Sequence, residues 1–242
     1  MLKPVVFAGP SVHGLAGDLF DGLDVFPPAA RGDILRAVGQ GRRVIGLIDG
    51  YFNSTPSVWH KEILFALQEG CRVYGAASMG ALRAAECFPF GMVGVGAIFA
   101  DYQAGRRQSD ADVAVSHAPA ELGYCPLTLA LVDAEATLSA ALKGGFIAES
   151  AHDALLKAAT GLHFSTRTWV RVLSETGLSE AESAHFLKCL PEFEQSLKRQ
   201  DAQKLLTNLK ENIEIETHDG QDSWKIQNTL FLKSLEKEVL GR

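Results

Sequence analysis

Short hydrophobic runs alternate with turn residues along the first half of the chain. Four runs are short and rich in Val, Ile, Leu and Phe, which predicts buried strands near residues 4–8, 23–26, 43–48 and 72–76. The run at 43–48 is apolar at nearly every position, as expected for a strand covered on both faces. Two prolines, Pro27 and Pro28, end the second run. Each predicted strand ends at a turn residue.

Apolar residues at helical spacing fill the intervals between these strands. Gly32 and Asp33 open one predicted helix, and Thr55 with Pro56 opens another that continues to Leu67, with Thr55 as its N-cap. Strands that alternate with helices and short connections favour a mainly parallel sheet. We therefore predict an α/β fold with flanking helices for residues 1–125.

From Pro126 onward the pattern is almost entirely helical, which predicts a helical region over residues 126–242. We interpret this region as supporting a core or docking a partner. Apolar positions at helical spacing predict helices over 129–142, 149–160, 166–175, 180–190, 191–216 and 224–240. Ser179 and Glu182 have the spacing of a capping box.

The segment between these halves offers weaker signals. Its glycines at 91–96 do not follow the G-x-G-x-x-G order of a dinucleotide site, so we expect close packing against the sheet. Asp110 and Asp112 are either solvated acids or ligands of a cation.

The composition and net charge of the chain argue against several classes of function. The 242 residues are 47% hydrophobic and 21% charged with a net charge of -6, which argues against nucleic acid as a partner. No apolar run is long enough for a membrane span, and no long apolar stretch of a signal peptide follows Met1, so we expect a cytoplasmic protein. The four cysteines form no C-x-x-C pair, so we predict neither a metal site nor a cofactor. A sulfur role for Cys71 or Cys87 remains an alternative to buried thiols.

The stretch from Arg72 to Glu86 carries the strongest candidate chemistry. It changes from β-forming residues through small residues into helix formers, and Ser78 stands at the change. A serine at such a turn can be a nucleophile, with the backbone amides of Met79 and Gly80 as oxyanion donors. The G-x-S-x-G pattern is incomplete because Ala76 replaces its first glycine. Alternatively, Ser78 is a turn residue or helix N-cap.

A nucleophilic serine needs a base, and Lys61 and His60 are the candidates at the start of the preceding helix. Lysine becomes a base where burial and nearby positive charge disfavour its protonated form. Lys61 has apolar neighbours and lies near the positive end of a helix. Alternatively, it is a surface lysine that pairs with Glu62 or Glu69. His60 either orients the pair or is a structural histidine. Asp49, at the end of its strand, either orients Lys61 or caps a turn.

Several motifs together resemble the TfuA-like proteins, the partners of YcaO enzymes in peptide thioamidation. The resemblance covers about the first half of the chain, at Gly9–Pro10, Pro27–Pro28, Gly32–Ile34, Ile48–Phe52, Pro56–Leu64, Val73–Glu86, Phe90–Gly96 and the acidic stretch that ends at His117. Ala111 departs from the pattern, since another acid is expected there.

The resemblance implies a hydrolase-like site in which Ser78 and Lys61 form a serine and lysine pair. It implies that sulfide is released from the C-terminal thiocarboxylate of a ubiquitin-like sulfur-carrier protein and passed to YcaO. YcaO would then form a backbone thioamide in a substrate peptide or protein. The alternative hypotheses are a non-catalytic adaptor that recruits the substrate to YcaO, and a generic esterase or amidase.

Overall fold

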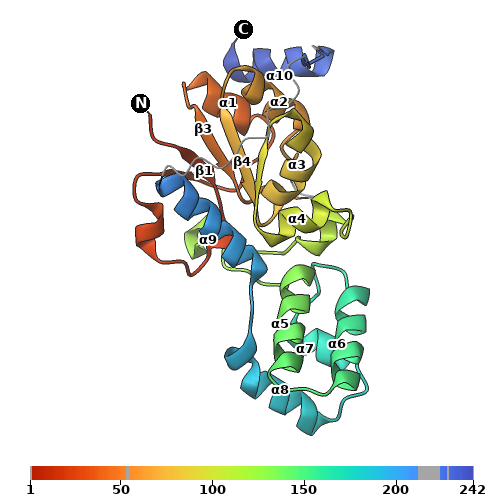
Figure 1. Cartoon of the computed structure of the whole chain (residues 1–242). Helices are drawn as coiled ribbons and strands as arrows, with labels where there is room; N and C mark the ends of the chain where they lie inside the picture. The colour runs from red at the N-terminus through yellow and green to blue at the C-terminus, as the bar shows by residue number, and fades with distance from the viewer. Residues whose placement is uncertain (1, 53–54, 212–223, 228, 242) are drawn as a thin grey trace. The chain divides into compact units, whose positions relative to one another are not determined.

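The computed structural model describes residues 2–52, 55–211, 224–227 and 229–241. Within these residues, five parallel strands form one sheet in the order β2-β1-β3-β4-β5 (Figure 1). The strands are β1 (Val5–Phe7), β2 (Asp24–Phe26), β3 (Val44–Leu47), β4 (Arg72–Ala76) and β5 (Val93–Val95). The predicted α/β class is therefore confirmed. The order reverses between β1 and β3, and in such sheets the functional crevice lies at the carboxyl ends of the strands.

Helices cover both faces of this sheet. On one face, α9 (Leu197–Lys210) packs its apolar side chains against the strands, and Leu205 and Leu209 contact Gly46 of β3. On the opposite face, α3 (Met79–Cys87) packs on β4. The strand residues that face α3 alternate with those that face α9. Around it lie α1 (Asp33–Gly39), α2 (His60–Gln68) and α4 (Ala97–Gln103).

Two glycines allow α3 to lie directly on the sheet. A Cβ atom on Gly80 would be 1.8 Å from the carbonyl oxygen of Leu47, and one on Gly75 would be 2.1 Å from the Gly80 carbonyl oxygen. The Gly80 amide also donates a hydrogen bond of 3.1 Å to the Ile48 carbonyl. The first turn of α3 is therefore fixed against β3 and β4 by backbone contacts that no other residue type permits.

Contacts divide the chain into two compact units, one of residues 1–108 and 199–242 and one of residues 109–198. The second unit packs α5 (Leu131–Lys143), α6 (Glu149–Gly161), α7 (Trp169–Ser174) and α8 (Glu180–Phe193) around an apolar core. In this unit, the buried Arg167 donates to the carbonyl oxygens of Ala159, Leu129 and Leu162. The capping box of Ser179 and Glu182 is present at the start of α8.

The limits of these two units differ from the predicted boundary between residues 125 and 126. The predicted helical region includes α9 and α10 (Leu230–Leu240), and both of these helices contribute to the unit that holds the sheet. The predicted boundary describes a change in secondary structure, and its value as a domain limit stays a prediction.

Several predicted elements differ from the structure in their limits. Helix α2 begins at His60 rather than Pro56, because Glu62 accepts a hydrogen bond from the Trp59 amide and caps the helix there. The glycine-rich segment near residue 94 forms β5 itself, at the edge of the sheet. Trp224 precedes α10 rather than starting it. Short 3-10 helices occupy Pro10–Val12, Gly17–Phe20, Phe88–Phe90, Asp110–Asp112 and Ala120–Leu122.

Gly80→Ala is expected to destabilise the protein strongly, because the added methyl group would overlap the Leu47 carbonyl. We expect the free energy of unfolding to fall by about 3 kcal/mol in urea denaturation. Gly161→Ala is the control, because a Cβ atom there meets no heavy atom within 4 Å. Equal stability of the two variants would contradict the close packing of α3 on the sheet.

Candidate functional site

Ser78 occupies the turn between β4 and α3, as the sequence predicts. The Ser78 amide donates to the Ala76 carbonyl at 2.8 Å, which closes a three-residue turn around Ala77. Ala77 has a φ of 65°, an uncommon conformation for a residue with a side chain. Strained turns of this kind cluster at functional sites. Ser78 itself is the N-cap residue of α3 and is only 3% exposed.

The amides after Ser78 do not both match the predicted oxyanion role. The Gly80 amide donates to the Ile48 carbonyl, so it is engaged in the structure and cannot also bind an oxyanion in this arrangement. Met79 is buried at the start of α3, against Gly50 of the loop after β3. The oxyanion role of Met79 stays a prediction.

Asp49 is buried beside β1 and binds the loop that follows this strand. One carboxylate oxygen accepts hydrogen bonds from the amides of Gly9 at 2.8 Å and Ser11 at 3.0 Å, and the other accepts from the Ser11 hydroxyl at 2.6 Å. These bonds join the ends of β1 and β3 at the place where the strand order reverses. Both carboxylate oxygens of Asp49 therefore bind this loop, as expected if Asp49 caps a turn.

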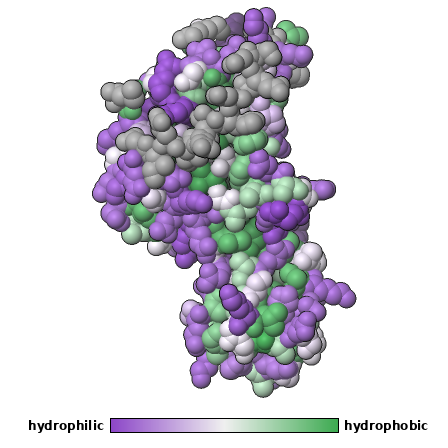
Figure 2. Space-filling model, viewed as in Figure 1, coloured by the Kyte–Doolittle hydropathy of each residue, from purple (hydrophilic) through white to green (hydrophobic). Residues whose placement is uncertain are grey.

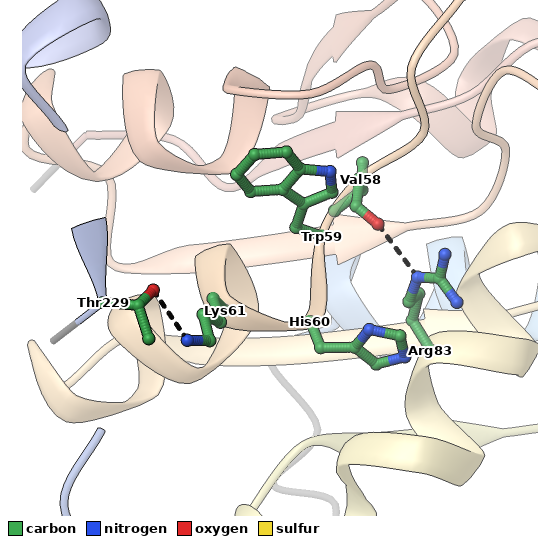
Figure 3. A pocket seen from close by; sticks show the side chains of 6 residues that line it. All are labelled: Val58, Trp59, His60, Lys61, Arg83 and Thr229. Atoms are coloured by element: carbon green, nitrogen blue, oxygen red, sulfur yellow. Dashed lines mark hydrogen bonds between the residues drawn. The ribbon is translucent and has the colours of Figure 1, made fainter. Parts of the chain in front are cut away.

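Lys61 lies in the first turn of α2 and lines a cavity of about 490 Å³ (Figure 3). Its ammonium donates to the hydroxyl of Thr229 at 2.8 Å, just before α10. The residues that line the cavity are Val58, Trp59, His60, Lys61, Arg83 and Thr229. Ser78 is not among them. The structure thus brings Lys61 together with His60 and Thr229, and the Ser78–Lys61 pair stays a prediction.

A shared carboxylate holds His60 and Arg83 at the other side of the cavity. Glu86 accepts from Arg83 at 2.7 Å and lies 2.6 Å from the Nε2 atom of His60. Arg83 also donates through Nε to the Val58 carbonyl at 3.0 Å. Burial alone would raise the pKa of Glu86, but the hydrogen bonds from His60 and Arg83 lower it below its ordinary value. Sequence patterns gave no signal for Arg83 or Thr229, because Arg83 binds Val58 and Thr229 binds a side chain of α2, and both partners are distant in the sequence.

Glu62, next to Lys61, is fully buried. Its two oxygens accept hydrogen bonds from the amides of Gly32 at 2.8 Å and Trp59 at 3.1 Å, so it connects the starts of α1 and α2. Burial raises its pKa to about 7, although the backbone hydrogen bonds act in the opposite direction. Glu62 therefore fixes the backbone that carries Lys61.

The remaining candidates from the sequence are the cysteines Cys71 and Cys87 and the acids Asp110 and Asp112. Burial raises the pKa of the Cys87 thiol to about 12 and also raises that of Cys71, which disfavours the reactive thiolate. Asp110 and Asp112 lie in a short 3-10 helix, and in the described part of the chain no three potential ligands group together as a metal site would require.

Together, the fold and these residues define a parallel α/β protein with a buried serine at a strand-to-helix turn and a cationic cavity at a neighbouring helix. Residues 49–168 match the family model described as TfuA-like protein. This match includes Ser78, Lys61, His60 and Arg83, and it places the chain in the TfuA-like family. A comparison with curated proteins found no match. The TfuA-like family is linked to thioamidation by YcaO.

Over the described ranges, none of the helices has the length and apolar character that crossing a bilayer demands. The cytoplasmic location stays a prediction.

The raised pKa of Glu62 makes the stability of the fold depend on pH. The folded protein holds the proton up to about pH 7, whereas the unfolded chain loses it near 4.5, so proton binding stabilises the fold at low pH and this stabilisation is lost as pH rises to 7. Relative to Glu62→Gln, the wild type is expected to lose about 3 kcal/mol between pH 4.5 and 7, measured by urea denaturation. Glu69→Gln, exposed at the end of the same helix, is the control. A constant difference between wild type and Glu62→Gln over this range would refute the raised pKa.

Proposed function

We propose that this protein hydrolyses the C-terminal thiocarboxylate of a ubiquitin-like sulfur-carrier protein and supplies the sulfide to a YcaO enzyme. The observation that carries the proposal is the position of Ser78 within the matched region, at a strained turn between β4 and α3. The partners are the carrier, the YcaO enzyme and the peptide or protein that receives the thioamide. The activity requires no cofactor.

The proposed reaction follows acyl-transfer chemistry. The Ser78 hydroxyl attacks the thiocarboxylate carbon and Lys61 accepts the serine proton. Lys61 then passes this proton to the departing sulfur as the carbon–sulfur bond breaks, which releases hydrosulfide. Lys61 then assists the attack of water on the acyl-serine, which leaves the carrier with an ordinary carboxylate. Asp49 takes part by fixing the ends of β1 and β3 through its three hydrogen bonds. His60 is held beside Lys61 by Glu86.

Positive charge near the reacting group supports this proposal. A thiocarboxylate is an anion, and its charge repels a nucleophile unless nearby cations offset it. Arg83 supplies one such cation at the cavity that Lys61 lines. This mechanism also requires a local rearrangement, because Lys61 must leave Thr229 and Ser78 must become accessible to the carrier.

A second candidate function is that of an adaptor that recruits the substrate peptide to YcaO. The burial of Ser78 favours it, since a serine residue that is only 3% exposed is not presented to a protein substrate. The helical unit favours it as well, because residues 109–198 contain 12 acidic and 6 basic side chains and so carry a surplus of negative charge. Hydrophobic residues are also exposed there, including Leu122, Leu127 and Val170, and Figure 2 shows hydrophobic surface among the polar residues of this unit.

Ser78→Ala and Lys61→Ala are each expected to abolish sulfide release from a thiocarboxylated carrier, by about 1,000-fold or more, while the circular dichroism spectrum is unchanged. Sulfide is measured directly in single-turnover reactions of the purified protein. Ser116→Ala, in the other unit, is the control for replacing a serine.

Full activity of both variants would exclude the serine and lysine mechanism. Thioamide formation by a Ser78→Ala strain without added sulfide would support the adaptor function instead. Hydrolysis of simple acyl esters by the wild type, without activity on the carrier, would indicate a generic esterase.

A further inference from the structure

The cavity at the start of α2 has the size and the walls of a ligand site. Its volume of about 490 Å³ lies within the range of small-molecule pockets. Val58 and the Trp59 ring form an apolar wall, while Lys61, His60 and Arg83 bring polar groups to the same space (Figure 3). A third cation, Arg31, lies 5.5 Å from the centre of the Trp59 ring and fixes the ring from outside the lining.

Positive charge exceeds negative charge at this cavity. Lys61 and Arg83 are both cations, and the carboxylate of Glu86 neutralises one of them while also binding His60. Between the described residues, Lys61 forms no ion pair, and its hydrogen-bond partner Thr229 is neutral. Arg31 adds no surplus because it pairs with Glu238 at 3.1 Å. Among the described residues, the cavity therefore has about one unit of uncompensated positive charge.

The backbone adds to this surplus. His60 and Lys61 are the first two residues of α2, where the helix dipole and the first amides favour a negative group. Glu62, the only acid of this first turn, has both oxygens on the amides of Gly32 and Trp59 rather than on Lys61. The local acid thus serves the backbone and leaves the ammonium without a charged partner among the described residues.

We propose that this cavity binds an organic monocarboxylate with an apolar group next to the carboxylate. Lys61 pairs with the carboxylate, with Arg83 behind it, and Trp59 and Val58 contact the apolar group. A single surplus charge balances a monoanion better than a phosphate dianion. The ligand is either the carboxyl end of a peptide or a small free carboxylic acid.

This inference goes beyond the proposed hydrolysis, because it needs no nucleophile at Ser78. The two proposals use Lys61 in different protonation states, as a cation here and as a base there. Lys61→Arg separates them, because it keeps the positive charge of the anion site and removes the proton acceptor.

The experiment measures binding by isothermal titration calorimetry with the full chain. The probes are 3-phenylpropionate and N-acetyl-Ala-Ala-Phe with a free carboxyl end, each compared with its amide. We expect the free acids to bind about 10- to 100-fold more tightly than the amides, because a charge-assisted hydrogen bond is lost. Tighter binding of the peptide acid assigns the carboxyl end of a peptide, and tighter binding of 3-phenylpropionate assigns a small acid.

Variants locate the binding in this cavity. Lys61→Met is expected to weaken binding of the free acid about ten-fold or more, while Lys61→Arg and Ser78→Ala stay within about three-fold of the wild type. Lys233→Met, an exposed lysine of α10 outside the cavity, is the control. A second variant, Trp59→Ala, removes the apolar wall and is expected to weaken both the acids and the amides.

Three outcomes would overturn the proposal. Equal binding of acids and amides would show that the carboxylate charge does not contribute to binding. Unchanged binding to Lys61→Met would show that the ligand binds outside this cavity. Displacement of the acid by inorganic phosphate at lower concentration than by acetate would assign a phosphate site. Loss of sulfide release with intact acid binding in Lys61→Arg would leave the proposal standing and would support Lys61 as the base.

Discussion

The close contact between α3 and the sheet is the constraint on which the rest of the structure depends. Gly80 lies directly on the Leu47 carbonyl at the end of β3, and its amide binds the next carbonyl along the chain, that of Ile48. Asp49 follows at once and ties the loop after β1 to the same edge. Because these contacts are made by backbone and by a buried carboxylate, the carboxyl edge of the central strands is rigid, and Ser78 is fixed within it.

This rigidity has a cost for catalysis at Ser78. The strained turn at Ala77 aims the chain into α3, but the same packing engages the Gly80 amide and buries the serine hydroxyl. Acyl transfer needs a nucleophile and oxyanion donors that a substrate can reach. The accessible charge lies instead at α2, where Lys61 lines a cavity. A substrate that reacts with Ser78 and also binds in the cavity at Lys61 must therefore either extend from one to the other or alter the local structure when it binds.

The sequence predicts the parts of the fold that local patterns determine. The short apolar runs mark β1, β2, β3 and β4, and the change from β-formers to helix formers marks the turn at Ser78. It does not predict contacts that depend on distant segments. Helix α2 begins four residues late because Glu62 binds the amide of Gly32, thirty positions away, as well as that of Trp59. Lys61 meets Thr229 across 168 residues, so no spacing rule could find this neighbour.

The distribution of charge explains why the two proposed functions, hydrolase and adaptor, are compatible. Residues 109–198 account for the whole surplus of acidic over basic side chains. The unit with the sheet has equal numbers of both, and Lys61 and Arg83 line its cavity. An acidic surface attracts a basic partner and repels an anion, whereas the cavity does the reverse. A protein partner and an anionic group therefore require different units of this chain. Because neither requirement consumes the residues of the other, both functions can be carried by one protein.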